Sequence, residues 1–179
     1  TNLANKTCLS LGYSAGNLTC NDICKFKTSD CRITKEFGSV TSDNSKATVI
    51  DNNGNIFISG YTDGSIINAE NLGSNDIFLS NFDNSGNMIW TKQYGSSNSD
   101  TVSSMTIDTT GNIYIAGNTL GKLYENNCNI SSGTTCSTDA FLIKINNNGE
   151  IQWSKQFGTS NVDEALSVAV DSNGNIIVS

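Results

Sequence analysis

The sequence predicts an all-β fold of repeated, four-stranded antiparallel units, preceded by a small disulfide-rich module. Three observations lead to this prediction. An Asp-x-x-Gly-Asn-Ile pattern, flanked by aliphatic and β-branched residues, occurs three times, at 51–56, 108–113 and 171–176. The chain has 16 Gly and no Pro, which suits many strands joined by short turns. Four of its six cysteines fall within the first 31 residues.

Residues 1–32 are predicted to form a module held together by disulfides. They contain too few apolar residues for a core, and an even number of cysteines in so short a segment favours two disulfides. A four-cysteine zinc site needs two closely spaced pairs, and only Cys20 and Cys24 form one. The sequence does not decide among the three possible disulfide pairings. The four cysteines are Cys8, Cys20, Cys24 and Cys31.

The other two cysteines, Cys128 and Cys136, lie in a later loop rich in Asn, Ser and Thr. A local disulfide between them is the first interpretation, and two exposed free thiols are the alternative. Cysteines used in this way indicate an oxidising compartment, so we expect an extracellular or cell-surface protein.

The rest of the chain, residues 33–179, repeats with spacings of 57 and then 63 residues. The glycines that obey these spacings are Gly38, Gly95 and Gly158. The six additional residues fall between Gly117 and Asp139, in the loop that holds the last two cysteines. An insertion confined to one loop is typical of repeats that share a rigid frame.

Each repeat contains four strand-like runs, which in the second repeat are 102–108, 112–118, 139–146 and 151–157. Four antiparallel strands per repeat, without helical periodicity, indicate β-propeller blades. The repeats are 39–95, 96–158 and a partial third at 159–179. Closed propellers have about four to eight blades. We therefore expect either a piece of a longer protein or a ring completed by association of copies.

Residues 33–38 precede the first repeat and match the end of a fourth strand. Ile33–Phe37 aligns with Trp90–Tyr94, without three strands of its own. A terminal strand of this kind completes the last blade of a ring by main-chain hydrogen bonds, and we predict this closing role for it. If the backbone of this strand stayed unpaired, its exposed edge would promote aggregation.

The repeated motifs resemble the bacterial β-propeller repeat family SBBP. The resemblance covers residues 33–179 and implies a secreted or cell-surface protein without shared catalytic residues. The first 31 residues also resemble small cysteine-rich modules that precede repeat domains in bacterial surface proteins. The motifs that carry the SBBP resemblance are Trp153–Gly158, Asp163, Val168–Ile176, Gly60–Thr62 and Asp139–Leu142.

Several residue types recur once per repeat, which favours structural roles. Asp–Gly pairs in the hairpins hint at calcium loops, but their spacing departs from that of an EF-hand, so hairpin turns are the better interpretation. Two tryptophans could stack on sugars, but their fixed position in the repeat favours packing between blades. The structural positions are Asp51, Gly54, Asp108, Gly111, Asp171, Gly174, Trp90 and Trp153. We predict no cofactor and no metal.

Catalysis has little support in the sequence. The chain has no His, so it lacks imidazole bases and His–nucleophile pairs. A carboxylate pair, as in glycoside hydrolases, remains open among acids outside the repeat register, namely Glu70, Glu125 and Glu164. The alternative to a non-catalytic protein is therefore an extracellular carboxylate-dependent hydrolase or lyase.

The expected function is a secreted or surface β-propeller that binds through loops at the blade ends. Its partner would be a protein, a glycan or further copies of itself, the last giving a self-assembling ring or filament. A net charge of −7 argues against nucleic acid, and no apolar run is long enough to span a membrane. The candidate interaction loop spans 120–138 and includes Leu120, Tyr124, Glu125 and Asn129.

Overall fold

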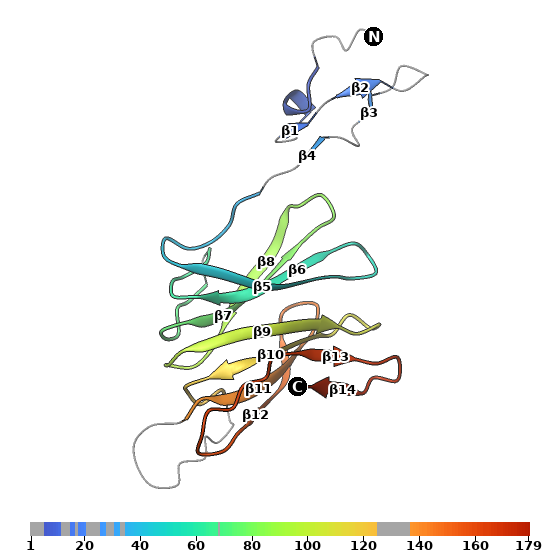
Figure 1. The fold of residues 1–179 in the computed structure, drawn as a ribbon. Helices are drawn as coiled ribbons and strands as arrows, with labels where there is room; N and C mark the ends of the chain where they lie inside the picture. The colour runs from blue at the N-terminus through green and yellow to red at the C-terminus, as the bar shows by residue number, and fades with distance from the viewer. Residues whose placement is uncertain are drawn as a thin grey trace. The chain divides into compact units, whose positions relative to one another are not determined.

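The computed structural model divides the chain into two compact units, Thr1–Glu36 and Phe37–Ser179. Figure 1 shows the ribbon of both units. The structure describes residues 6–11, 15–16, 18–20, 26–27, 31–32, 35–67, 69–124 and 137–179.

In its described residues, the N-terminal unit has a disulfide and very short strands. A 3₁₀ turn, η1 (Leu9–Leu11), is followed by β1 (Ala15–Gly16), β2 (Thr19–Cys20), β3 (Phe26–Lys27) and β4 (Cys31–Arg32). Strand β1 pairs with β4 and β2 with β3, both antiparallel. A disulfide joins Cys8 to Cys31, with Cα atoms 5.5 Å apart. The side chains of Cys20, Cys24, Cys128 and Cys136 lie outside the described residues, so their predicted pairing stays a prediction.

The second unit is built from four-stranded antiparallel sheets, which confirms the predicted fold class. Blade one has the order β5-β6-β7-β8, blade two β9-β10-β11-β12, and the partial blade three is the hairpin β13-β14. The strands are β5 (Asp43–Ile50), β6 (Ile56–Thr62), β7 (Asp76–Phe82), β8 (Met88–Tyr94), β9 (Asp100–Ile107), β10 (Ile113–Thr119), β11 (Asp139–Ile145), β12 (Ile151–Phe157), β13 (Val168–Val170) and β14 (Ile176–Val178).

Alternation of side chains along each strand gives the blades two apolar faces. In a strand, successive side chains point to opposite sides of the sheet, so β6, β7, β10 and β11 can be buried on both. Strand β9 lies against β5 on one side and β13 on the other (Figure 1). The blades therefore stack face to face in chain order.

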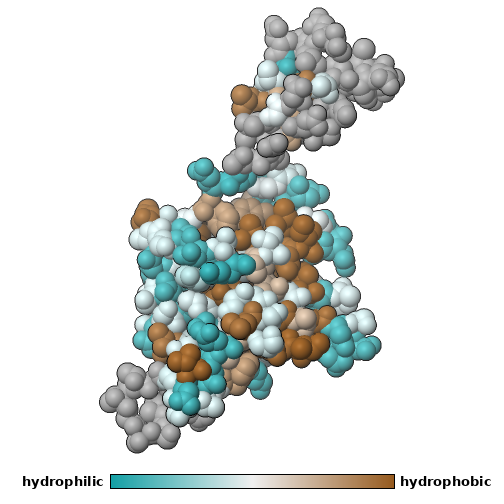
Figure 2. Space-filling view, in the orientation of Figure 1, coloured by the Kyte–Doolittle hydropathy of each residue, from teal (hydrophilic) through white to brown (hydrophobic). Residues whose placement is uncertain are grey.

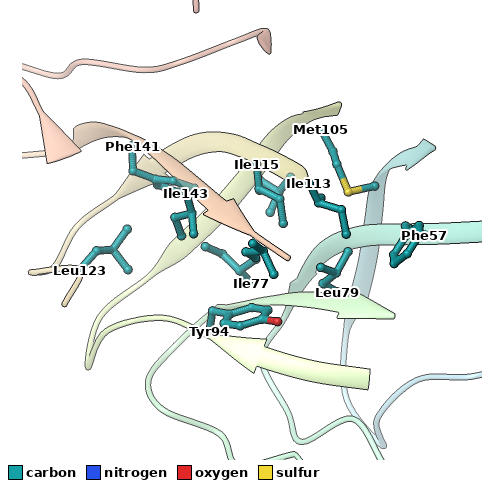
Figure 3. Close-up of a cluster of buried hydrophobic side chains, with 12 residues drawn as sticks. Phe57, Ile77, Leu79, Tyr94, Met105, Ile113, Ile115, Leu123, Phe141 and Ile143 are labelled. Carbon is teal, nitrogen blue, oxygen red and sulfur yellow. The ribbon is translucent and has the colours of Figure 1, made fainter. Parts of the chain in front are cut away.

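The largest core lies between blades one and two. Figure 3 shows Ile77 and Leu79 of blade one directed toward Ile113, Ile115 and Ile143 of blade two. A second core joins blade two to blade three. Its buried members are Tyr114, Ala116, Ala140, Leu142, Ala165 and Val168.

The predicted closing strand is only partly described. Ile33 and Thr34 lie outside the described residues, and Lys35–Phe37 lie outside the strands. The Phe37 ring packs on blade one, 6.1 Å from the Phe78 ring and 5.0 Å from that of Phe82. The closing role stays a prediction.

Figure 2 shows apolar residues at the surface of the repeat unit, interspersed with hydrophilic ones. The single short helix in the described part of the chain is far too short to cross a membrane.

Candidate functional site

The repeat unit has two distinct ends. Because neighbouring strands of each sheet are antiparallel, the connections between them lie alternately at one end and at the other. At one end, here called the turn end, lie the tight hairpins 51–55, 83–87, 108–112, 146–150 and 171–175. At the other, the loop end, lie the longer connections 63–75, 95–99, 120–138 and 158–167. The difference in length between the two full repeats lies at the loop end, in the connection 120–138.

The turn end is built from aspartates that bind their own hairpins. Asp51 Oδ1 accepts hydrogen bonds from the backbone N–H groups of Asn53 and Asn55, both at 2.8 Å. Asp108 and Asp171 repeat this geometry, beside glycines with positive φ at 54, 111 and 174. Burial alone would raise the pKa of the Asp108 carboxyl, but hydrogen bonds from Asn112, Thr110 and Tyr114 hold it well below its usual value.

This geometry does not support the interpretation of the hairpins as calcium-binding loops. The carboxylate oxygens of these aspartates already accept hydrogen bonds from the turn itself. Among the described residues there is no cluster of three or more acidic or cysteine side chains able to hold a metal ion. A cavity of about 360 Å³ lies between the first hairpins of blades one and two, and its walls are mainly turn residues.

Both tryptophans lie on blade faces. The Trp90 ring is 6.1 Å from the Phe57 ring and packs against the core between blades one and two. The Trp153 ring is 6.2 Å from the Tyr114 ring and packs against the second core. Their rings face other core residues of the protein.

At the loop end, one aspartate in each repeat fixes the connection that leads into the first strand. Asp100 accepts hydrogen bonds from the backbone N–H of Ser96 at 2.6 Å and from its hydroxyl at 3.0 Å. Asp43 binds Ser39, and Asp163 binds Thr159, in the same way. These carboxylates therefore bind backbone groups within their own repeat.

Two of the loop-end carboxyls, those of Asp76 and Asp100, are fully buried and lie close to Gly95. A Cβ atom at Gly95 would lie 2.6 Å from Asp76 Oδ1 and 2.9 Å from Asp100 Oδ2. Burial raises the pKa of both carboxyls, and the charge of Asp76 adds to the effect on Asp100. Burial, followed by the charges of Asp100 and Asp76, also raises the pKa of the Tyr124 hydroxyl. The candidate loop thus starts beside a buried acidic pair.

A glutamine in the fourth strand anchors each variable loop to the frame. In blade two, Gln156 Nε2 donates to the Gly121 carbonyl at 3.0 Å, and its Oε1 accepts the Leu123 N–H at 3.0 Å. In blade one, Gln93 makes the same two bonds, to Gly64 and Ile66. The variable loops are therefore held identically up to these residues.

The two variable loops begin to differ after the same position of the repeat, and the residue at that position has a left-handed backbone conformation. This position is Ile67 in blade one, with φ of 27°, and Tyr124 in blade two, with φ of 54°. Positive φ is costly for residues other than Gly and gathers at functional sites. Beyond it, Ala69–Asn75 of blade one differs from the longer segment of blade two. Sequence reasoning named Tyr124 as a loop residue without its backbone conformation, and it missed Ile67 and the loop-anchoring role of the two glutamines, although Lys-Gln-aromatic-Gly recurs in the chain.

The predicted interaction residues are partly described. Leu120 and Tyr124 are 45% and 41% exposed, on either side of the buried Leu123. Glu125 and Asn129 lie outside the described residues. Two large side chains are thus presented to solvent where the longest loop begins.

In the described part of the chain, the acids outside the repeat register are not brought together in a cavity. Glu70 is exposed, and Glu164 is exposed and accepts a hydrogen bond from Asn118 Nδ2 at 3.3 Å. Glu125 lies outside the described residues. Neither of the described cavities is lined by Glu70 or Glu164.

Comparison with known proteins agrees with this architecture. The family model "Beta-propeller repeat" (SBBP) matches residues 89–125 and 152–177. This match supports the resemblance of the repeats to the SBBP family. A curated relative, "Regulatory protein FlaEY" of Caulobacter vibrioides, is 26% identical over 124 residues. The match covers 68% of this chain and 13% of that relative, so the chain spans a small part of its length.

Proposed function

We propose that this protein is a non-catalytic binding module, extracellular or on the bacterial cell surface, that holds a partner at its loop end. The observation behind the proposal is the shared exit point of the variable loops. The frame is repeated up to Leu123, and beyond it the chain presents Tyr124 and a loop six residues longer than that of blade one. A constant scaffold with loops that differ is suited to selective binding.

The cysteines support the proposed location. The N-terminal unit contains the Cys8–Cys31 disulfide, and disulfides persist in oxidising compartments. The relative is named a regulatory protein, and a binding role would be compatible with such a name. The cysteine-rich unit would then act as a spacer or a second docking element beside the repeats.

Loop exchange tests the proposal. Residues 124–138 are replaced by the blade-one segment 67–75, which leaves the Gln156 anchor in place. Partners are first identified by cross-linking the full chain on the cells that produce it, with mass spectrometry of the products. We expect the exchanged variant to keep its thermal unfolding temperature and lose the partner. Retention of the partner at unchanged affinity would contradict binding through this loop.

A Tyr124→Ala variant sharpens the result, because it removes one exposed ring and leaves the loop length unchanged. The matched control is Ile67→Ala, at the same repeat position in blade one. Loss of the partner with Tyr124→Ala, but not with Ile67→Ala, would assign binding to the blade-two loop.

A further inference from the structure

The buried carboxyls of Asp76 and Asp100 lie at the roots of the two variable loops. Asp76 is the first residue of β7, and its Oδ2 accepts hydrogen bonds from the Leu72 backbone N–H at 2.6 Å and from Gln93 Nε2 at 3.3 Å. Gln93 is also the residue that anchors the blade-one loop. Asp76 therefore ties this loop and its anchor to the start of a buried strand.

Asp100 holds the root of the blade-two loop. Its Oδ1 accepts a hydrogen bond from the Thr119 hydroxyl, whose oxygen in turn accepts the Gly121 N–H at 2.9 Å. Its Oδ2 accepts the backbone N–H and the hydroxyl of Ser96. One carboxyl from each blade thus fixes the root of one variable loop.

The two carboxyls differ in how their oxygens are partnered. Both oxygens of Asp100 accept hydrogen bonds, whereas Asp76 Oδ1 is buried and has no hydrogen-bond partner in the described part of the chain. Asp76 Oδ1 and Asp100 Oδ2 both lie within 2.9 Å of one point, the position of a Cβ atom at Gly95. A buried carboxylate oxygen without a partner is costly, and a proton on it removes the charge and supplies a donor that faces Asp100.

Positive side chains do not offset this pair, because neither carboxyl forms an ion pair with a lysine or arginine among the residues that the structure describes. The titratable group that faces the pair from the blade-two loop is the Tyr124 hydroxyl, whose pKa is itself raised by burial and by the two carboxyls, so it stays neutral. The Tyr94 hydroxyl donates to the Gly149 carbonyl and also stays neutral, because burial raises its pKa. Burial raises the pKa of both carboxyls, and the charge of Asp76 raises that of Asp100 further. The pair therefore favours a state with one proton.

We propose that Asp76 and Asp100 form a proton-operated clasp between the two variable loops. With a proton on Asp76 Oδ1, the pair carries one negative charge, the Asp76 hydroxyl donates to Asp100, and the two loop roots are held together. Loss of this proton to solvent leaves two buried negative charges close to each other, and their repulsion loosens both roots. The pH thus sets how firmly the loop end is held.

Urea unfolding of the full chain at a series of pH values, followed by tryptophan fluorescence, tests the clasp. Asp76→Asn is the decisive variant, because an amide mimics the protonated acid: its oxygen accepts the Leu72 N–H and its NH₂ group faces Asp100. Folding raises the pKa of Asp76 above 3.8, so the wild type loses stability as the pH rises above that value, and the variant does not share this loss. We expect the unfolding equilibrium constant of the wild type to rise about tenfold relative to that of Asp76→Asn between about pH 4 and about pH 8.

Two controls accompany this variant. Asp139→Asn changes the same repeat position in blade two, where the oxygens accept hydrogen bonds from Ser137 and Gln156, so it should destabilise the protein. Glu70→Gln removes one exposed negative charge and should follow the wild type. A ratio of the unfolding constants of wild type and Asp76→Asn that does not change with pH overturns the proposal. So does an Asp76→Asn variant that is less stable than the wild type at about pH 8.

Hydrogen exchange with mass spectrometry tests where the clasp acts. After correction for the intrinsic pH dependence of exchange, residues 72–76 and 96–100 should lose protection in the wild type as the pH rises and keep it in Asp76→Asn. The turn-end hairpins should stay protected in both proteins. A loss of protection spread evenly over the repeats would contradict a clasp at the loop roots. Neither measurement uses a binding partner, so this proposal and the binding proposal fail or hold separately.

Discussion

At the scale of the residue, Gly95 is the clearest case of a position fixed by close approach. A Cβ atom at this position would lie 2.6 Å from the buried Asp76 Oδ1 and 2.9 Å from the buried Asp100 Oδ2. We expect Gly95→Ala to destabilise the repeat unit by about 1–3 kcal/mol, because the added methyl forces buried side chains to move. The measurement is urea unfolding followed by tryptophan fluorescence.

Gly38 provides the matched control, since it occupies the same repeat position before blade one. A Cβ atom there would meet the carboxylate of Asp43, 2.5 Å away, but Asp43 is exposed, so its side chain moves at the cost of its hydrogen bonds from Ser39 and without disturbing buried groups. Gly38→Ala should therefore cost much less than Gly95→Ala. Equal losses would show that the carboxyl pair around Gly95 does not restrict this position.

At the scale of the element, the hairpin turn depends on its aspartate. Asp108 accepts five hydrogen bonds, from Thr110, Asn112 and Tyr114. Replacing it with Ala leaves backbone N–H groups unpaired, and we expect a loss of about 1–2 kcal/mol in the free energy of unfolding, since water replaces part of the lost bonding. Thermal unfolding at neutral pH measures this loss.

The pH dependence gives the same prediction a second readout. The pKa of Asp108 in the folded protein lies below its usual value of 3.8. Its contribution is therefore complete above 3.8 and lost as the pH falls below that value. The gap in stability between wild type and Asp108→Ala should narrow on acidification below pH 3.8. A gap that stays constant would mean that the turn does not depend on the charged carboxylate.

The sequence predicts these elements well because their signals are local. An Asp-x-x-Gly-Asn hairpin contains both the residue that caps the turn and the glycine that adopts positive φ. The loop exits were not predictable for the opposite reason. Tyr124 and Ile67 take positive φ because distant glutamines, Gln156 and Gln93, fix the residue before each of them. The burial of Asp76 beside Asp100 likewise depends on contact between blades one and two.

At the scale of the whole molecule, the repeat spacing predicted the blades, and their stacking follows from apolar residues on both faces of each sheet. The pairing of cysteines in the N-terminal unit could not be predicted from the sequence, because the spacing of the cysteines does not rank the three possible pairings. The structure joins Cys8 to Cys31, which are 23 residues apart. This disulfide closes residues 8–31, about two thirds of the N-terminal unit, into one loop.

Removal of that disulfide should separate the stabilities of the two units. A loop of this length stabilises a fold by about 3 kcal/mol through restriction of the unfolded chain. In the N-terminal unit the strands have two residues each, and Cys8 and Leu18 are its described buried apolar residues. Cys8→Ser with Cys31→Ser should therefore abolish amide protection in residues 1–36. The repeats have a core of their own, so protection in β6, β7, β10 and β11 should stay at the wild-type level, as hydrogen exchange with mass spectrometry measures. If protection falls in both units together, the repeats depend on the N-terminal unit for their stability.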